Sequence, residues 1–336
     1  MTLLAESPAG LPAAVDPTAL SLNENPYPPL PAVRSALIAA LEAANRYPEF
    51  LPEQLRRVIA ARIGVPATQV ILGAGATGVI LQVLHALTSP GDRIVMAEPT
   101  FDGYPIIAAM NRLQTMSIPL TRDGHHDLAA MAEAARDARV LVICRPHNPT
   151  GTVESAAAIE TLLARLPDTL VVLDEAYVEF VAGAHRIDST TLVQRFANVV
   201  VLRTFSKAYG LAGLRIGYGF GSRELADSLW AMQLPFGMSV TSLVAVEASY
   251  LAESQLRQRI CAITAEREFL RARLADLHVE SIPGHANFLY LPPGDGARRL
   301  CDQDGLRVKH YGDGAVRLSI GAQSSTDAVL AALGSG

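Results

Sequence analysis

The chain contains 336 residues, 50% of them hydrophobic, and carries a formal net charge of −5 at pH 7. This length favours about two domains, and the apolar share is large enough to form a substantial core. The negative charge argues against a general nucleic-acid partner or an anionic membrane surface, because no basic field would attract either one.

The cysteines and the N-terminus exclude several further classes of protein. The three cysteines, Cys144, Cys261 and Cys301, are far apart and form no CxxC pair, so they indicate neither a disulfide framework nor a zinc site. The histidines at 85, 125, 126 and 147 show no metal-ligand spacing, so we expect surface or loop positions for them and no metal. The N-terminus lacks a basic signal segment, and no apolar run is long enough to cross a bilayer. A soluble, cytoplasmic protein is expected.

The first two-thirds of the chain predict an α/β fold. Proline and turn formers, as in SLNENPYPPLP at 21–31, indicate a looped segment before a helix at 32–44. Apolar, β-branched runs then alternate with helical patterns, which predicts βαβ units and a mostly parallel sheet covered on both faces. The predicted strands are 70–72, 93–98, 139–144, 169–174 and 198–204, and helices between them include 77–88, 127–137 and 154–166.

The pattern changes after about residue 240. One long helix is predicted over roughly 241–276, followed by strands at 286–291 and 315–320 and a last helix near 325–333. This order is typical of a smaller α+β domain. We therefore expect a large domain at 45–240 and a small domain made of 1–44 and 241–336, in which the N-terminal residues form an arm.

Polar residues and glycines follow the predicted strands. Ligands of open parallel sheets bind beyond the carboxyl ends of the strands, so these residues are the candidates for a site. They are GAGATG at 73–78, PTF at 99–101, RPHNPTG at 145–151, DEAY at 174–177 and FSK at 205–207. Taken together, they predict one pocket.

The segment GAGATG is open to three interpretations. Gly73, Gly75 and Gly78 form a G-x-G-x-x-G pattern between a strand and a helix, and Glu98 lies 20 residues further on, as in a dinucleotide fingerprint. Glycine amides at a helix N-terminus bind the phosphate of any other cofactor equally well. A plain turn is the third interpretation, and the glycines alone do not separate the three.

Asp174 and Lys207 favour one cofactor over the others. A carboxylate that ends an apolar strand is costly to bury without a cationic partner. Asp174 is therefore either a helix cap or the partner of a protonated heterocyclic nitrogen. Lys207 is either a surface lysine or a desolvated amine that forms an imine. An imine-forming lysine, an aspartate for a pyridinium and a glycine cradle for a phosphate match pyridoxal 5′-phosphate, whereas nicotinamide needs neither the lysine nor the aspartate.

Three motifs carry a resemblance to a known family. NPTG at 148–151, DEAY at 174–177 and TFSKAYGLAGLRIGY at 204–218 resemble the fold-type I pyridoxal-phosphate-dependent aminotransferases of class I/II. The resemblance is to their histidinol-phosphate aminotransferase branch, which includes aromatic aminotransferases. LNENPYPP, NRYP, HANFLYL and VRLSIG extend it over about residues 19–321. It implies an aspartate aminotransferase-like fold, with an α/β/α sandwich that binds the cofactor, and a homodimer with a shared active site.

The resemblance also implies a role for each matching residue. Lys207 holds the cofactor as an imine and then moves the proton at the substrate Cα, Asp174 pairs with the ring nitrogen, and Arg317 binds the substrate α-carboxylate. Asn148 and Tyr177 contact the ring oxygen, and Phe101 stacks on the ring. The phosphate is held by Gly75, Ala76, Thr77, Thr204, Ser206 and Arg215, and by Tyr47 of the neighbouring subunit. Asn23 and Tyr27 line the substrate side.

The chain departs from the family pattern at several positions. The family usually has asparagine where His147 stands, and commonly Asp-Glu where Thr77 and Gly78 stand. Lys309 stands where a histidinol-phosphate enzyme is expected to have an arginine for the substrate phosphate. Because lysine lacks the planar fork of arginine, this substitution disfavours histidinol phosphate as the substrate.

The expected reaction is a ping-pong transfer of an amino group from an L-amino acid, or an amino-alcohol phosphate, to a 2-oxo acid such as 2-oxoglutarate. A decarboxylase of an amino-acid phosphate, or an oxygen-using relative, remains an alternative on the same fold. An NAD-dependent oxidoreductase using Gly73, Gly75 and Gly78 is the alternative from another class. A regulator with an aminotransferase-like domain is disfavoured, because too few residues precede the large domain for a helix-turn-helix. The amino donor is left open.

Overall fold

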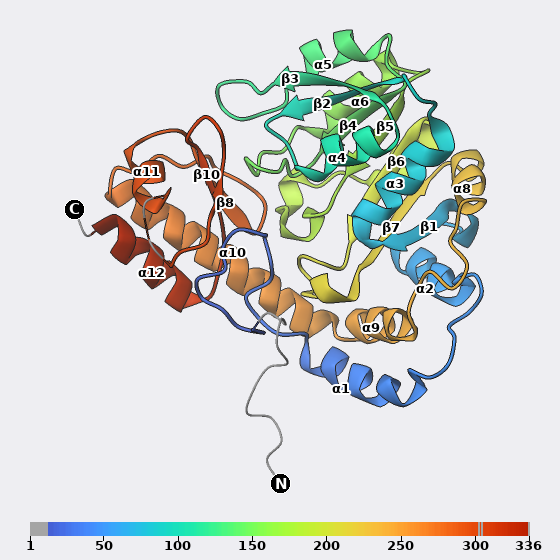
Figure 1. Ribbon diagram of the computed structural model, residues 1–336, viewed down its shortest axis with the longest axis horizontal. Coiled ribbons are helices and arrows are strands. Elements are labelled where there is room, and N and C mark those ends of the chain that lie inside the picture. The colour runs from blue at the N-terminus through green and yellow to red at the C-terminus, as the bar shows by residue number, and fades with distance from the viewer. Residues whose placement is uncertain (1–12, 302, 304, 335–336) are drawn as a thin grey trace.

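Two β-sheets organise the chain, as the computed structural model shows for residues 13–301, 303 and 305–334 (Figure 1). Residues 1–12, for which we expect no targeting signal, lie outside the described residues. A seven-stranded sheet has the order β1-β7-β6-β5-β4-β2-β3, and a three-stranded sheet has the order β8-β10-β9. Within the described residues, no helix is both long and apolar enough to span a membrane.

The seven-stranded sheet is mostly parallel, as predicted. Only β7 runs antiparallel to its neighbours, β1 and β6; the other neighbouring pairs are parallel. All five predicted strand runs are present. The strands are β1 Val70–Ala74, β2 Arg93–Glu98, β3 Gln114–Pro119, β4 Val140–Cys144, β5 Leu170–Asp174, β6 Val199–Thr204 and β7 Ile216–Gly221.

Helices cover both faces of this sheet, which explains why its central strands are apolar at every position. Along β4, Val140 and Val142 face one core, whereas Leu141 and Ile143 face the other. The first core includes α3 Gly75–Leu87, α4 Gly103–Met110 and α8 Arg223–Trp230. The second includes α2 Glu53–Ile63, α5 Leu128–Ala135, α6 Ala156–Arg165 and α7 Ser189–Arg195.

The prediction of one long helix at 241–276 is wrong, because the structure has two helices there. α9 Val240–Leu251 and α10 Glu253–Asp276 are separated at Ala252, whose φ of −91° and ψ of 31° leave the helical region. The helices pack on different partners: α9 lies against α1, while α10 contacts α12 and β8. Alanine favours helix, so the sequence gives no sign of the break.

The remaining C-terminal elements confirm the predicted strands and last helix. They form the three-stranded sheet and its covering helices, and lie apart from the large sheet in Figure 1. Their bounds are β8 Phe288–Leu291, α11 Asp295–Cys301, β9 Lys309–His310, β10 Val316–Ser319 and α12 Gln323–Gly334. The short 3₁₀ helices of the chain are Leu41–Ala43, Ala67–Gln69, Val178–Phe180, Gly183–His185 and Ala212–Leu214.

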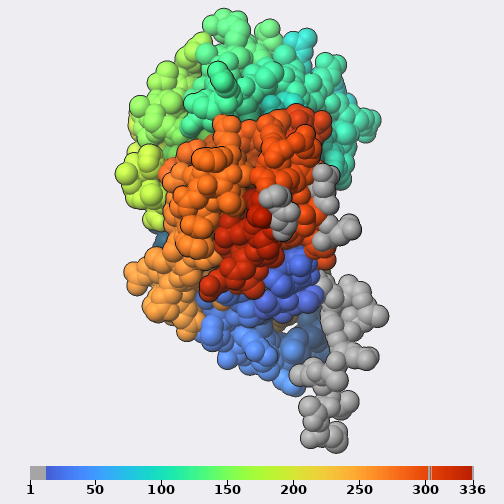
Figure 2. All heavy atoms as spheres, turned by 90° about the vertical axis from the view of Figure 1, so that its left-hand side faces the viewer, coloured from blue at the N-terminus to red at the C-terminus, as the bar shows by residue number. Residues whose placement is uncertain are grey.

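The segment before α1 Pro31–Ala40 joins the two sheets. Leu20 accepts a hydrogen bond from the Ser319 amide of β10 at 2.8 Å and donates one to the Arg307 carbonyl at 2.9 Å. Beyond it, the Asn25 side chain donates to the Lys207 carbonyl at 3.0 Å. Figure 2 shows the N-terminal segment in blue directly below the C-terminal elements in red. The segment is therefore placed between the residues that follow β6 and the three-stranded sheet.

Candidate active site

A cavity of about 370 Å³ lies where the carboxyl ends of the large sheet meet the N-terminal segment and the small sheet. The strand ends that the sequence singled out converge on it. Most of the predicted site residues line it, namely Asn23, Ala76, Thr77, Phe101, Asn148, Asp174, Tyr177, Thr204, Ser206, Lys207, Arg215, Lys309 and Arg317.

Three predicted residues do not line this cavity. Gly75 lies just behind it, and its amide donates to the Arg215 carbonyl at 3.1 Å. Tyr27 lines a neighbouring cavity formed by the N-terminal segment. Tyr47 is 83% exposed on its own chain, and its ring packs against that of Phe236, at 4.8 Å between centroids.

Lys207 follows β6, and its amine lies inside the cavity. Its Nζ donates to the Leu22 carbonyl at 2.9 Å and lies 5.8 Å from the centroid of the Tyr177 ring. Burial, together with the nearby Arg317 and Arg215 cations, lowers the pKa of Lys207 to about 8. The unprotonated amine, the form that attacks a carbonyl, is therefore far more populated near neutral pH than in an ordinary lysine.

Asp174 ends β5, beside β6, and is 6% exposed. Its Oδ2 accepts a hydrogen bond from the Tyr104 hydroxyl at 2.5 Å, and its Oδ1 accepts one from the Ala176 amide at 2.9 Å. Burial raises the pKa of Asp174, while these two hydrogen bonds oppose the rise. Sequence reasoning missed Tyr104. It comes three positions after Phe101 and follows the end of β2, so the strand-end rule could have included it.

The N-terminus of α3 forms a cradle for an anion. Gly75 has φ +76°, and a Cβ there would lie 2.3 Å from Nη2 of Arg215, so only glycine lets the guanidinium approach. Arg215 itself has φ +53° and places Nη1 3.4 Å from Oγ of Ser206. Backbone amides at a helix N-terminus, hydroxyls and a permanent cation suit a phosphate. The hydroxyls are those of Thr77, Thr204 and Ser206.

Arg317 enters the cavity from β10. It is 6% exposed; Nη1 donates to Oδ1 of Asn148, and Nη2 donates to the Ser21 carbonyl at 2.5 Å. Its buried Nε has no hydrogen-bond partner. A buried guanidinium with an unused donor is costly unless an acceptor arrives, so this geometry suits a carboxylate ligand.

The same network includes Tyr177. Its hydroxyl accepts from Nδ2 of Asn23 at 3.0 Å and from Nδ2 of Asn148 at 3.3 Å. Burial raises the pKa of Tyr177, so the hydroxyl stays protonated. Asn148, Tyr177 and Arg317 are thereby fixed relative to one another.

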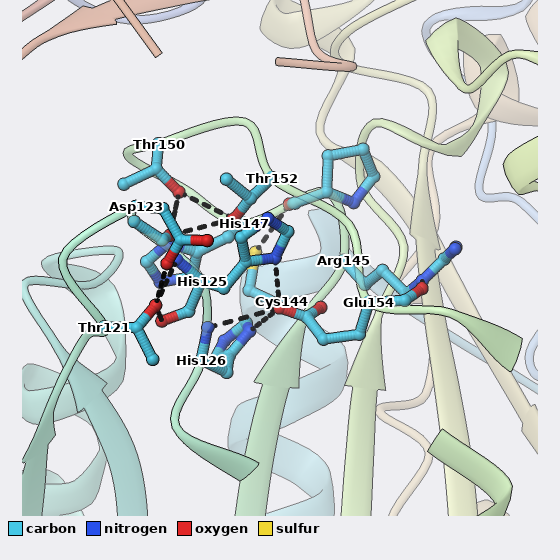
Figure 3. Close-up of polar contacts among 12 residues, drawn as sticks. Thr121, Asp123, His125, His126, Cys144, Arg145, His147, Thr150, Thr152 and Glu154 are labelled. Atoms are coloured by element: carbon cyan, nitrogen blue, oxygen red, sulfur yellow. Dashed lines mark hydrogen bonds and ion pairs between the residues drawn. The ribbon is translucent and has the colours of Figure 1, made fainter. Parts of the chain in front are cut away.

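Two buried histidines, His126 and His147, lie together beside Glu154 (Figure 3). Nδ1 of His126 lies 2.8 Å from Oε1 of Glu154, and the ring of His147 packs edge-on against His126 at 4.4 Å. His126 and His147 therefore lie in loops, as expected, but both are buried, and Glu154 satisfies His126 in the interior. Nδ1 of His147 contacts Oγ1 of Thr150 at 3.0 Å and so braces the loop. No group of three or more His, Cys, Asp or Glu within the described residues could hold a metal.

The residues present fit pyridoxal phosphate. An amine of lowered pKa and a buried carboxylate face the same cavity, and an anion cradle lies at its edge. Together with an α/β sheet of this order, these features define the class of pyridoxal-phosphate-dependent enzymes of fold type I.

Comparisons with known proteins give the particular family. The family model for aminotransferase class I and II matches residues 15–334. The chain is 41% identical over 319 residues to an aromatic amino acid aminotransferase of Cutibacterium acnes, covering 94% of this chain and 91% of that protein. It is also 41% identical over 333 residues to one of Streptomyces coelicolor, covering 96% and 92%. The chain belongs to the class I and II aminotransferases and is a pyridoxal-phosphate-dependent aminotransferase.

A solved structure agrees with this assignment. The histidinol-phosphate aminotransferase of Sinorhizobium meliloti in complex with pyridoxal 5′-phosphate superposes with a TM-score of 0.87 at 26% identity, covering 94% of this chain and 89% of that one. The family assignment confirms the resemblance and the cofactor, and it replaces the dinucleotide interpretation of GAGATG.

Proposed function

We propose that this aminotransferase takes the amino group from an aromatic L-amino acid and passes it to a 2-oxo acid. The relatives with 36–41% identity are named aromatic amino acid aminotransferases. The structural observation that carries the proposal is the ion pair between Lys309 and Asp102 at the cavity. This ion pair affects which substrate side chains the cavity accepts.

The Lys309–Asp102 pair disfavours a phosphate-bearing substrate. Lys309 is the residue expected to meet a substrate phosphate, but its Nζ is already bonded to the Asp102 carboxylate. That carboxylate would repel a phosphate dianion, by about 1 kcal/mol in bulk water to about 4 kcal/mol near a protein surface for each pair of unit charges about 4 Å apart. Leu22, Ile80 and Tyr311 also line the cavity and provide apolar surface for an aromatic ring.

We assign the roles in the reaction to residues that line this cavity. The cofactor, when bound, supplies the electron sink that makes the substrate Cα acidic. The Lys207 amine binds the cofactor and then carries the proton at the substrate Cα. Asp174 holds the proton on the ring nitrogen, and Arg317 orients the substrate through its α-carboxylate.

The other predicted residues hold the cofactor in place. Asn148 and Tyr177 donate to the ring oxygen, and Phe101 lies against the ring. Arg215, assisted by the hydroxyls and amides around it, binds the phosphate. Those hydroxyls and amides belong to Gly75, Ala76, Thr77, Thr204 and Ser206. Asn23, which donates to Tyr177, lies on the substrate side.

A single-turnover experiment tests the substrate class. The purified enzyme with bound cofactor is mixed with phenylalanine, tyrosine, histidine or histidinol phosphate, and the loss of the cofactor's visible absorbance is followed. We expect the aromatic amino acids to react at least tenfold faster than histidinol phosphate. A histidinol phosphate rate equal to or above that of phenylalanine would refute the proposal. Identification of the product as a 2-oxo acid, rather than an amine and CO₂, separates transamination from decarboxylation.

A matched pair of variants tests the physical reason. Asp102→Asn removes the repelling charge, so the rate with histidinol phosphate should rise relative to that with phenylalanine. Asp137→Asn removes an exposed carboxylate outside the cavity and should leave the ratio unchanged. If both variants leave the ratio unchanged, the ion pair does not select the substrate.

We further propose a cytoplasmic homodimer in which Tyr47 reaches the phosphate site of the partner. The exposed aromatic side chains of Tyr47, Phe50 and Phe236 pack on one another, and together they leave an apolar surface that a second copy could cover. Light scattering on the purified enzyme tests the dimer, and a monomer of full activity would refute it.

The division into a large domain at 45–240 and a small domain of 1–44 plus 241–336 is also proposed.

A further inference from the structure

Tyr104 has no role in the assignments above, yet it makes the shortest hydrogen bond to Asp174. Its hydroxyl donates to Oδ2 at 2.5 Å, while the Ala176 amide occupies Oδ1. Tyr104 is 1% exposed and comes from α4, which lies on a different part of the chain from β5. A tyrosine buried this deeply is held by its surroundings, and its hydroxyl points at the carboxylate.

The two hydrogen bonds leave Asp174 with unused acceptor capacity. An ionised carboxylate has about four lone-pair sites, and the structure fills two of them. Both Asp174 and Tyr104 line the cavity, so the remaining acceptor sites are available to a ligand there. Among the charged or titratable groups around Asp174, Glu175 raises its pKa and Lys207 lowers it. Cys144 also lies close to this pair.

We propose that Tyr104 is a positioning residue for transamination: its hydroxyl keeps the Asp174 carboxylate ionised and oriented toward the ring nitrogen of the cofactor. The inference rests on the proposed role of Asp174. Without the tyrosine donor, burial favours the neutral acid, and a neutral acid is a poor partner for a protonated ring nitrogen.

The properties of the tyrosine itself suit this role. Burial and the Asp174 charge raise the pKa of Tyr104, so its hydroxyl remains a donor over the working pH range. Its ring packs edge-on against Phe101, with 5.3 Å between centroids. Tyr104 therefore contacts both Phe101, the residue assigned to the face of the cofactor ring, and Asp174, the residue assigned to the ring nitrogen. A shift of either residue displaces the other through Tyr104.

The test is the Tyr104→Phe variant with cofactor bound. A hydrogen bond to a charged group corresponds to about a ten- to hundredfold effect, so we expect the half-reaction with phenylalanine to slow by that factor. A second readout is the pH midpoint of the cofactor's visible absorbance. It should rise, because a ring nitrogen that has lost its proton no longer withdraws electrons from the lysine-bound nitrogen. A merely structural loss would not move this midpoint.

Tyr218→Phe is the matched control. Tyr218 is 5% exposed, its hydroxyl lies close to the charged Arg203, and it does not line the cavity. The control should keep the wild-type pH midpoint and rate. If Tyr104→Phe does not fold, Tyr104→His keeps a donor on an aromatic ring and should have a pH midpoint close to wild type. A soluble His variant whose midpoint has moved as far as that of Asp174→Asn would overturn the proposal.

The Asp174→Asn background separates this inference from the proposed function. If Tyr104 acts through Asp174, adding Tyr104→Phe to Asp174→Asn should produce little further change in rate or midpoint. Independent, additive effects of the two substitutions would refute the inference. If Asp174→Asn alone leaves rate and midpoint unchanged, the proposed role of Asp174 fails. If Asp174→Asn changes both and Tyr104→Phe changes neither, only the role of Tyr104 fails.

Discussion

Replacing Arg317 with lysine is the most direct test of how the site recognises its substrate. The guanidinium contacts Asn148 and Ser21 through its two terminal nitrogens, and its buried Nε has no hydrogen-bond partner. A lysine has a single nitrogen and cannot serve both of these partners and a substrate carboxylate. The substitution therefore removes at least one charge-assisted hydrogen bond in the complex, which amounts to about 1.5–3 kcal/mol, or a ten- to 150-fold loss in kcat/KM.

The assay compares two substrates that differ only in the carboxylate. Single-turnover rates are measured with phenylalanine and with phenethylamine, which has the same ring and amine but no carboxylate. Arg317→Lys should slow the reaction of phenylalanine by the stated factor and leave the slow reaction of phenethylamine nearly unchanged. Arg267→Lys is the control, because Arg267 is also buried, donates to the Ala286 carbonyl at 2.9 Å and lies outside the cavity. Equal losses for both substrates would refute carboxylate recognition by Arg317.

Three further predictions address the cofactor and the dimer. Lys207→Ala should abolish turnover in a coupled assay. In the wild-type apoenzyme, the rate of capture of added pyridoxal phosphate should rise with pH around a midpoint near 8, because only the unprotonated amine attacks. A midpoint above 10 would contradict the lowered pKa of Lys207. Gly75→Ala should weaken cofactor binding at least tenfold by equilibrium dialysis, because the new Cβ meets the Arg215 guanidinium; Gly64→Ala, also at positive φ but in open space, should bind normally. Tyr47→Ala mixed with Lys207→Ala should regain part of the activity through hybrid dimers, and no regain would argue against a shared site.

Much of the fold and of the site's composition could be predicted from the sequence, for a simple physical reason. Strands buried on both faces, such as β4 and β5, must be apolar throughout, so they appear as continuous runs. The carboxyl ends of parallel strands share one edge of the sheet. Asp174 ends β5 and Lys207 comes soon after the neighbouring strand β6, which is why a rule about strand ends placed both at one cavity.

Strand β7 was missed because its sequence, IGYGFG, alternates glycine with larger residues and lacks an apolar run. The glycines have a structural reason. A Cβ on Gly217 would come within 2.2 Å of the Gly75 carbonyl carbon, so β7 can pass beneath the anion cradle only with glycine at that position. The glycines that make β7 hard to predict from sequence therefore also let the anion cradle lie close to Arg215.

Contacts that tune the predicted residues could not be predicted, even where the strand-end rule could have included the residue itself, as for Tyr104. Tyr104 meets Asp174 across 70 residues of sequence, and Lys309 meets Asp102 across 207. In each pair one member is a residue that sequence motifs point to, whereas its partner lies in a segment without a motif. Motifs identify groups that do chemistry, because those groups are limited to a few residue types. A tuning partner needs only a donor or a charge at the right place, which many residue types supply. Its identity therefore depends on packing between distant segments, and packing is fixed only by the folded chain.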